Sequence, residues 1–444
     1  MSPRTRQKPG LAELLRAGRV DEFVKRALDL EPADLADVLS SLDDAERLTA
    51  VRALPPEISG EALVEMPEEE HAEDTLAALE PEQAADIVDE MADDDATDIL
   101  QELEPEEQER ILSEVEDRAG VDRLLRYDEE SAGGLMTTQV VSVLDTATAG
   151  EAIEEIRRQA EEDEGFYQVF VVDGVGKLEG VLPLRDLVTS APTRLVREFM
   201  EPADITVTPE LDQEEVARLM SKYNLPSVPV VDASGRLLGR VTFDDVIDVV
   251  EAETTEDLLK FGGVSPDEEL SASWSVAVRS RLPWLYVNLL TAFAAASVVL
   301  VFSNAIQELK WLAVFMPVIA GMGGNAGTQA LAVSVRRIAL GQVPPGAAGG
   351  IVGKEMVVGL VNGLANALIA GSIAWFAAGP KFGAVVAFAM TGNLAVAGFA
   401  GAFVPLLLER LKVDPAIASS VFVTTFTDMC GFFLLLGMAT RFLI

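Results

Sequence analysis

The hydrophobic positions of the chain are concentrated after residue 282. Five long runs there carry no charged residue apart from one aspartate in the last, and they span residues 282–302, 311–335, 356–380, 382–408 and 415–440. Each run exceeds the roughly 20 residues that a helix needs to cross the hydrocarbon core of a bilayer. The shorter run at 338–353 is rich in Gly and Pro and indicates a loop or a helix lead-in. The pattern therefore predicts a transmembrane domain of five helices at 281–444.

The N-terminal third has a helical pattern that repeats. Residues 1–10 predict a disordered tail. From 11 to 130, a phrase that begins Glu-Pro and continues with acids and then an apolar pair recurs from Glu31, Glu80 and Glu104. Proline favours the first position of a helix, and acids favour the first turn. We therefore predict an all-α, acidic, superhelical domain of short stacked helices.

Residues 131–250 alternate short β-runs with helices, and the alternation occurs twice. Leu135-Met136-Thr137 matches Phe199-Met200-Glu201, and the strand before Asp173 matches the strand before Asp232. The sequence predicts two α/β copies at about 135–190 and 198–250. The pair resembles a tandem of CBS domains.

The CBS resemblance implies a nucleotide site in the second copy. The family phrase Gly-x-x-Ser/Thr-x-x-Asp often contacts an adenosine nucleotide, and Gly239, Thr242 and Asp245 fit it, so ATP is an expected ligand. The first copy has Pro183 where Ser or Thr is expected. As an alternative, Asp245 and its acidic neighbours face a metal ion or simply solvent.

Charge separates the same parts and excludes several functions. The chain has 73 acids and 34 bases, a net charge of −39, yet its mean hydropathy is +0.25. Residues 1–282 hold 68 of the acids, whereas 283–444 hold five. Such an acidic field repels nucleic acid. A single cysteine (Cys430) and a single histidine (His71) exclude disulfide frameworks, HExxH sites and Ser-His-Asp triads, so we do not expect an enzyme.

The basic residues near the spans predict an orientation. Seven basic residues flank one side of the predicted membrane helices, and three flank the other side. The seven are Arg279, Arg281, Arg336, Arg337, Lys354, Arg410 and Lys412. Positive residues are enriched on the cytoplasmic side. We therefore expect a multi-pass protein of the cell membrane with its N-terminus inside and its C-terminus outside. No N-terminal hydrophobic stretch resembles a signal peptide.

Asp428 is the most informative residue of the apolar third. It is the fourteenth of 26 residues in the last run, near the bilayer midplane. An ionisable group there costs a few kcal/mol, so a functional role is the default interpretation. The alternative is a buried aspartate hydrogen-bonded to a neighbouring helix. Thr424 and Thr425 precede it by one helical turn and give that face a polar stripe.

The second run carries four glycines in seven residues, Gly321, Gly323, Gly324 and Gly327. They permit either close helix packing or a break that exposes backbone carbonyls to a water-filled path. The polar neighbours Asn325 and Gln329 favour the path. The candidate pore-lining residues are Asn325, Gly327, Thr328, Thr424 and Thr425. Asn362 and Asn393 in the next two runs add polar groups or make interhelical hydrogen bonds.

The acidic charge peaks within the N-terminal helical domain. Residues 61–118 hold 24 acids and two bases. A charge run is ordinarily a solvated face, but a net of −22 here predicts self-repulsion unless multivalent cations neutralise it. Asp94 and Asp98 lie at the densest point and share a helical face. Weak magnesium or calcium binding through carboxylates and retained waters suits such a site.

The order of these parts resembles the MgtE family of magnesium channels and transporters over essentially the whole chain. The sharpest motifs are Gly323-Gly324-Asn325-Ala326-Gly327, Glu253-Thr254-Thr255-Glu256-Asp257 and the segment from Thr424 to Gly431. The resemblance implies a homodimer with one pore in the lipid bilayer, in which Asp428 faces hydrated magnesium. It also implies a plug helix within 251–280 that closes the cytoplasmic mouth when magnesium binds.

The resemblance places a set of regulatory carboxylates. They are Asp94, Asp98, Glu214, Asp245, Asp248, Glu256, Asp257 and Asp414. Three residues depart from the family pattern: Val421 replaces a Pro, Thr328 replaces an Asn, and Asn224 replaces an acid. The expected function is a magnesium-selective channel or transporter gated by intracellular magnesium. The alternatives are a CBS-regulated transporter of other divalent cations, such as cobalt or nickel, and a CBS-regulated channel for another solute.

Overall fold

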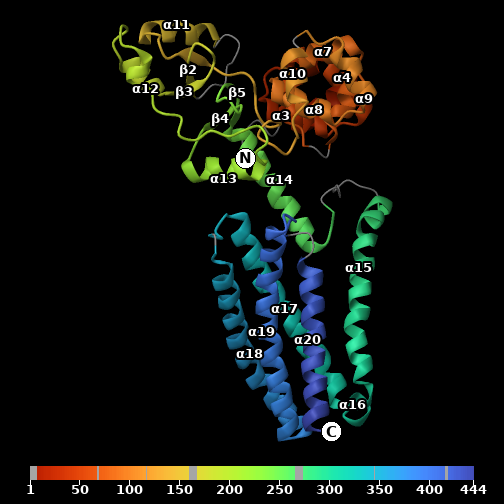
Figure 1. Ribbon diagram of the computed structural model, residues 1–444. Coiled ribbons are helices and arrows are strands. Elements are labelled where there is room, and N and C mark those ends of the chain that lie inside the picture. The colour runs from red at the N-terminus through yellow and green to blue at the C-terminus, as the bar shows by residue number, and fades with distance from the viewer. Residues whose placement is uncertain are drawn as a thin grey trace. The chain divides into compact units, whose positions relative to one another are not determined.

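The computed structural model describes residues 8–67, 70–116, 118–159, 168–265, 274–344, 346–415 and 419–444. Most of the tail predicted at 1–10 lies outside these residues. The chain divides into two compact units, Met1–Glu251 and Ala252–Ile444, and each is described by itself (Figure 1).

The first unit begins with a series of short helices. They are α1 (Lys8–Arg16), α2 (Val20–Ala27), α3 (Pro32–Ser40), α4 (Asp44–Ala53), α5 (Pro56–Val64), α6 (Ala72–Ala77), α7 (Pro81–Val88), α8 (Asp93–Gln101), α9 (Pro105–Leu112) and α10 (Arg118–Leu124). The repeated Glu-Pro phrase starts α3, α7 and α9, where Glu31, Glu80 and Glu104 are the N-caps and Pro is the first helical residue. The predicted helical domain is confirmed.

Each helix in this series packs on the next but one. Helix α3 contacts α5, α5 contacts α7, and α7 contacts α9. In the same way, α2 contacts α4, α4 contacts α6, and α6 contacts α8. One continuous apolar core runs through the stack and includes Phe23, Leu35, Leu63, Leu76 and Leu100. Most of the acids therefore lie on the outside of a stack whose stability comes from its apolar core, but Asp93 and Asp94 at the start of α8 are buried.

The rest of the first unit is a pair of α/β modules. Its elements are β1 (Ser142–Leu144), α11 (Ala149–Gln159), β2 (Val169–Val172), β3 (Leu178–Leu182), α12 (Leu184–Thr189), a 3₁₀ turn η3 (Val196–Glu198), α13 (Gln213–Tyr223), β4 (Ser227–Val231), β5 (Leu237–Thr242) and α14 (Phe243–Gly262). In the first module β1 pairs parallel with β2, which pairs antiparallel with β3. In the second, β4 and β5 are antiparallel.

Equivalent positions of the two modules meet each other. Gln168 and Ser227, which occupy the same place in the repeat, are hydrogen-bonded (Oε1 to Oγ, 2.8 Å). The turn after β2 also bonds the turn after β4, since the Leu178 N–H donates to the Gly235 carbonyl and the Leu237 N–H to that of Gly176. The two copies are therefore related by an approximate twofold axis, as expected for a CBS pair.

The opening segment of each copy packs on the other copy. Thr137 exchanges backbone hydrogen bonds with Arg240 on β5, and Glu201 does so with Val181 on β3. This approach requires glycine opposite: a Cβ on Gly239 would lie 2.4 Å from the Thr137 carbonyl oxygen. The exchange ties the two copies into one body, which the sequence repeat alone did not predict.

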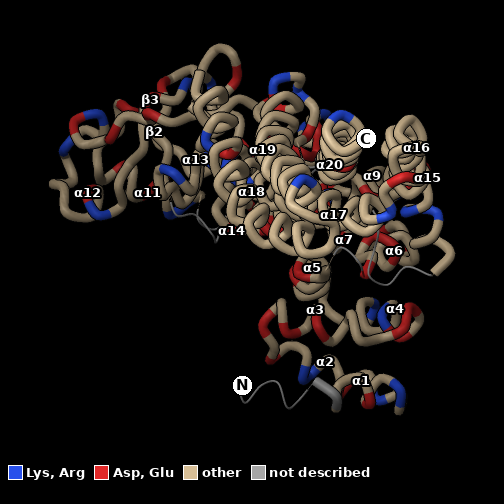
Figure 2. Tube along the Cα trace, turned by 90° about the horizontal axis from the view of Figure 1, so that it is seen from below, with Lys and Arg blue, Asp and Glu red and all other residues tan. Residues whose placement is uncertain are grey.

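The second unit consists mainly of long helices. They are α15 (Trp274–Val301), α16 (Ser303–Glu308), α17 (Trp311–Ala339), α18 (Ala348–Ala378), α19 (Pro380–Arg410) and α20 (Ser419–Phe442). Four of them, α15, α18, α19 and α20, are long and apolar enough to cross a membrane. Charged residues are sparse along α17 to α20 and frequent on α3 and α5 (Figure 2). A multidomain protein with a helical membrane region is confirmed.

Two element limits differ from those that the sequence predicted. Helix α14 continues without a break from the CBS module into the acidic connector, so the plug helix predicted within 251–280 is the later part of a CBS helix. Residues 266–273 of that range lie outside the described part. The first long helix begins at Trp274, before the uncharged run, because the residues before Leu282 continue the helical pattern.

The membrane helices pack closely through glycines. A Cβ on Gly359 of α18 would lie 2.2 Å from the Leu394 carbonyl oxygen of α19, and one on Gly398 of α19 would lie 2.3 Å from the Glu355 carbonyl oxygen. Small residues allow helix backbones to approach in this way in membranes. Helices α18 and α19 thus form a tight pair, against which α17 and α20 pack.

Candidate functional site

Asp428 lies on α20, half-buried in the single chain. The hydroxyls of Thr424 and Thr425, one turn earlier, donate to the carbonyls of Ser420 and Val421, both at 2.7 Å. Their protons are thereby used within the helix and their oxygens remain acceptors. Within the described residues, no hydrogen bond reaches the Asp428 carboxylate, so the alternative of an aspartate bonded to a neighbouring helix finds no support there.

The glycine-rich segment of α17 is a continuous helix. A Cβ on Gly323 would lie 2.2 Å from Asn393 Nδ2, and one on Gly327 would lie 2.7 Å from Val423 Cγ1 on α20. Close packing, rather than a break in the helix, is therefore the role of these two glycines, which corrects the interpretation that we favoured from the sequence. Asn325 and Gln329 are exposed on the single chain, whereas Gly327 is buried.

Asn393 contacts three helices of the second unit. Its fully buried side chain on α19 donates from Nδ2 to the Ile319 carbonyl of α17 at 2.9 Å. On its other side lies Gly431 of α20, where a Cβ would be 2.8 Å from Nδ2. The interhelical hydrogen bond that the sequence left as an alternative is confirmed for Asn393. It fixes α19 to α17, and α20 packs against the same side chain at Gly431, within one turn of Asp428.

The acids at the start of α8 have different roles. The carboxylate of Asp93 accepts hydrogen bonds from the Thr137 hydroxyl (2.7 Å), the Thr138 N–H (3.1 Å) and the Thr138 hydroxyl. It therefore ties the helical domain to the opening segment of the CBS pair. The sequence did not predict this hydrogen-bonded tie.

The neighbours of Asp93 form a crowded carboxylate cluster. Burial, with repulsion from Asp95 and Asp245, raises the pKa of Asp94 well above its usual value. Burial and nearby acids raise the pKa of Asp95 to about 7. Partial loss of hydration, and then repulsion from Asp95 and Glu129, raise the pKa of Asp98 to about 8, although this residue is exposed and solvent screens part of the effect. The structure thus brings together Asp94, Asp98 and Asp245, three of the carboxylates that the resemblance placed in the regulatory set, and adds Asp95.

This carboxylate cluster meets one requirement of a cation site but, among the residues that the structure describes, does not hold enough ligands for direct coordination. Asp94 Oδ1 is buried and has no hydrogen-bond partner within the described residues. Among those residues, no three side chains of the types that ligate metals are placed to hold one ion directly. Carboxylates that bind magnesium through retained waters do not need such close placement.

The expected nucleotide residues of the second CBS copy also have structural roles. The Thr242 N–H donates to Asp245 Oδ2 at 3.2 Å, and the Thr242 hydroxyl bonds the same oxygen. Thr242 directly precedes α14, so this pair caps the helix in the manner of a capping box. Pro183 holds the same position before α12 and makes no side-chain cap.

Two further predicted residues lie on α13. Glu214 is in its first turn, where its N–H bonds Asp212 Oδ1 at 3.0 Å. Asn224 ends the helix in a left-handed conformation (φ 51°). Asparagine tolerates that conformation better than most residues, which gives a backbone reason for this departure from the family pattern.

On α14, burial and then Glu251 and Asp244 raise the pKa of Asp248.

The later part of α14 brings three predicted carboxylates around a lysine. Lys260 Nζ lies 2.7 Å from Asp414 Oδ2 and also pairs with Glu256. Burial and then the charge of Asp414 raise the pKa of Asp257, while Lys260 opposes that rise. The sequence predicted the acids as one set but did not single out Lys260.

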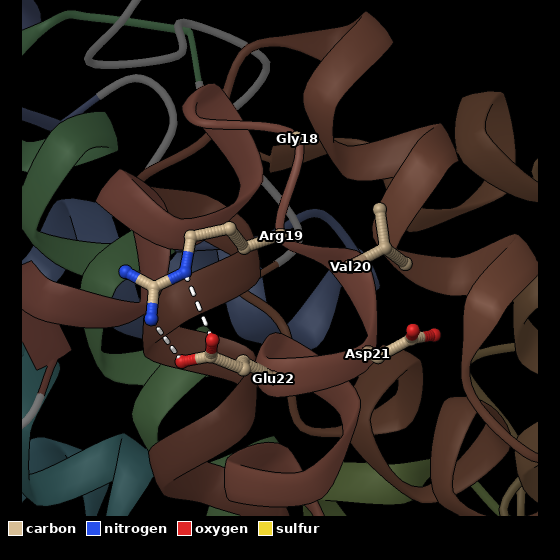
Figure 3. Close-up of a pocket in the computed structure, with 5 residues that line it drawn as sticks. All are labelled: Gly18, Arg19, Val20, Asp21 and Glu22. Carbon is tan, nitrogen blue, oxygen red and sulfur yellow. Dashed lines mark hydrogen bonds and ion pairs between the residues drawn. The ribbon is translucent and has the colours of Figure 1, made fainter.

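The hollow shown in Figure 3 does not belong to these sites. It is lined by Gly18, Arg19, Val20, Asp21 and Glu22 at the turn between α1 and α2. The Arg19 guanidinium pairs with the Glu22 carboxylate there (Nε to Oε1, 3.0 Å). None of the candidate residues lines it.

Known proteins match all the parts of the chain. Family models match the MgtE intracellular N domain at 30–130, CBS domains at 132–192 and 196–252, and the MgtE divalent cation transporter at 316–438. The magnesium transporter MgtE of Thermus thermophilus is 40% identical over 325 residues, covering 72% of both chains. The chain belongs to the MgtE family of divalent cation transporters. Members of this family are transporters, not enzymes.

Two more comparisons extend the match. The magnesium transporter MgtE of Enterococcus faecalis is 36% identical over 329 residues, covering 74% of this chain and 72% of that one. The crystal structure of the cytosolic domain of the Mg²⁺ channel MgtE in complex with ATP superposes with a TM-score of 0.52 at 37% identity. It covers 55% of this chain and 99% of that domain. The soluble architecture of this MgtE chain is therefore that of its family.

The carboxylate cluster predicts a pH dependence of the soluble part of this MgtE chain. Asp95 and Asp98 have folded pKa values of about 7 and 8, above the value of about 4 in an unfolded chain. Their contribution to stability is therefore complete below pH 4 and is lost as the pH rises through 7 to 8. In a chelator, we expect proteolysis of the intact protein within 8–251 to accelerate between about pH 5 and pH 8. An Asp95→Asn/Asp98→Asn variant should show a flatter profile, and equal profiles would contradict the assignment.

Proposed function

We propose that this chain is a magnesium channel or transporter of the cell membrane that works as a homodimer, with its N-terminus in the cytoplasm and its C-terminus outside. The observation that carries the proposal is the half-buried Asp428 in an otherwise uncharged span. The relatives named magnesium transporters support the choice of ion. The alternatives with cobalt or nickel as the main substrate are outcomes of the test below.

The proposal includes five membrane helices. Helix α17 is the fifth, because its 29 residues span about 43 Å at 1.5 Å per residue, more than the hydrocarbon thickness. Its glycines and Asn325 make it less apolar than the other four. The proposed domains are 11–130, 131–250, 251–280 and 281–444, and the matched family segments support the limits near 130 and 250.

In this proposal Asp428 attracts the permeating ion. Magnesium loses its coordinated waters reluctantly, so a wide site that hydrogen-bonds those waters suits the hydrated ion. A carboxylate that accepts no hydrogen bond from the described residues has its oxygens available for those waters. Two copies supply two such carboxylates, with Asn325, Thr328, Thr424 and Thr425 as further polar groups of the pathway.

The cytoplasmic carboxylates act as the sensor in this proposal. Asp94, Asp98 and Asp245 would hold magnesium between the helical domain and the CBS pair. Their pKa values are raised first by burial and then by neighbouring acids, and a cation would offset that repulsion. The buried, unpartnered Asp94 Oδ1 fits such a ligand. Glu214 and Asp248 of the CBS pair complete this set, and Glu256, Asp257 and Asp414 serve the connector.

A nucleotide belongs to the proposal as well. The related cytosolic domain was crystallised with ATP. In this chain Gly239, Thr242 and Asp245 fit the family phrase, and binding there would add phosphates beside the acidic cluster. Such a polyanion is compatible with the cluster when magnesium accompanies it, because the cation offsets the repulsion between phosphates and carboxylates.

Ion flux into proteoliposomes tests the proposed function. With magnesium, cobalt, nickel or calcium offered singly, we expect magnesium flux that a large excess of a monovalent salt does not abolish. Protein-free liposomes and liposomes with the Asp428→Ala variant are the controls. Transport of cobalt or nickel in preference to magnesium would replace the substrate, and no divalent flux above the controls would refute the function.

A further inference from the structure

Lys260 occupies the centre of the carboxylate group at the end of α14. Its Nζ is 2.7 Å from Asp414 Oδ2, in the connection between α19 and α20, and it also contacts Glu256 one turn earlier on its own helix. The lysine side chain is only 16% exposed. The ion pair with Asp414 joins residues 154 positions apart, so it fixes the end of α14 to the helix connection.

Against the opposing effect of burial, carboxylates are the charged groups that raise the pKa of Lys260. Glu256, Asp257 and Asp414 face it, and the other base of the same connection, Lys412, is exposed on the far part of the turn. These carboxylates offer oxygens to a divalent cation as well as to the ammonium, because carboxylate oxygens are ligands that such cations prefer. A lysine carries its charge on a flexible four-carbon stem, so it can leave such a group without backbone movement.

We propose that Lys260 is an internal counterion that holds α14 to the α19–α20 connection when no divalent cation is bound, and that a regulatory cation must displace it. This inference rests on the proposed gating and deepens it. The ammonium and the cation compete for the same oxygens of Glu256 and Asp414. Lys260 therefore has two opposite effects: it favours the docked connector at low magnesium and weakens magnesium binding at the same place.

Replacement of Lys260 by Met separates the two effects, because Met keeps the apolar stem and removes the charge. Hydrogen–deuterium exchange of residues 252–262 and 411–415 is measured in the full-length protein, first in a chelator and then along a magnesium titration. In the chelator, we expect faster exchange in Lys260→Met than in the unmodified protein. In the titration, we expect half-maximal protection at a magnesium concentration roughly two- to fivefold lower, the size of one partly exposed charge pair.

Two further variants make the result specific. Lys412→Met removes the same charge from the same connection, at an exposed side chain. It should exchange like the unmodified protein in the chelator. Lys260→Arg keeps the charge and should keep the protection in the chelator. Patch-clamp open probability against cytoplasmic magnesium, recorded in parallel, should show the same two- to fivefold shift for Lys260→Met.

Failure of this inference differs from failure of the proposed gating. If magnesium protects the unmodified protein and Lys260→Met with the same midpoint, or if Lys412→Met behaves like Lys260→Met, the counterion role is wrong and the gating stands. If magnesium protects neither the unmodified protein nor any variant, the gating is wrong and the competition falls with it.

Discussion

Replacement of Asp428 by Asn should lower divalent flux by about tenfold or more, while the protein still folds. A tenfold loss corresponds to roughly 1.4 kcal/mol on the barrier to permeation. Asn keeps the shape of the side chain and removes its charge. Because no described residue bonds the Asp428 carboxylate, the substitution breaks no hydrogen bond within that part of the chain and should leave α20 packed as before.

The control for this variant is a carboxylate of the same unit outside the span. Glu409→Gln, at the exposed end of α19, makes the same chemical change and should leave the flux unchanged. Flux is measured in proteoliposomes at matched protein content, and thermal unfolding in detergent checks that both variants fold. Flux at the unmodified level from well-folded Asp428→Asn protein would remove Asp428 from the pathway.

The features that the sequence predicted well are those encoded within short segments. A run of more than 20 apolar residues has few alternatives to a membrane helix, so four of the runs correspond to helices suited to cross a membrane. The Glu-Pro phrase starts α3, α7 and α9. Proline suits the first helical position because the N–H that it lacks would have no partner within the helix there. The CBS pair was predictable because its phrases recur in order.

The features that the sequence did not predict depend on distant contacts. Asp93 bonds Thr137, which is 44 positions away, Asn393 bonds Ile319 over 74 positions, and Lys260 pairs with Asp414 over 154 positions. Hydrophobic periodicity reports which face of an element is buried, and it carries no information on which distant element covers that face. For the same reason, the glycines of α17 indicated close approach without showing whether water or Asn393 lay opposite.

The exchange of opening segments between the CBS copies is a related case. Met136 belongs to the first copy in sequence but is buried in the core of the second, with Val216 and Val241. Leu124, at the end of the helical domain, is buried in that same core. The limits of the repeats in sequence therefore differ from the limits of the packed bodies, and truncations are best designed from the packing.

Removal of the acidic helical domain should yield a channel that conducts but no longer closes at high internal magnesium. The deletion of residues 1–117 retains α10, and with it Leu124 in the core of the second CBS copy. Opposed carboxylates repel over roughly 8–10 Å at physiological ionic strength, and magnesium between them reverses that repulsion. Without the domain, the CBS carboxylates have no partner surface to bridge, so magnesium bound between the two domains can no longer bias the connector.

A double substitution tests the same mechanism without a deletion. Asp94→Asn/Asp98→Asn should shift the closing concentration of magnesium upward by about tenfold, since several weak sites acting on one two-state element contribute a few kcal/mol between them. Asp86→Asn/Glu90→Gln removes the same charge from two exposed acids with the same spacing, and it should close like the unmodified channel. The measurement is open probability against magnesium on the cytoplasmic side of a patch.

The same recording decides the outcome for the deletion of residues 1–117. If that truncated channel closes at the same magnesium concentration as the intact one, the acidic domain is a solvated surface and the sensor lies elsewhere.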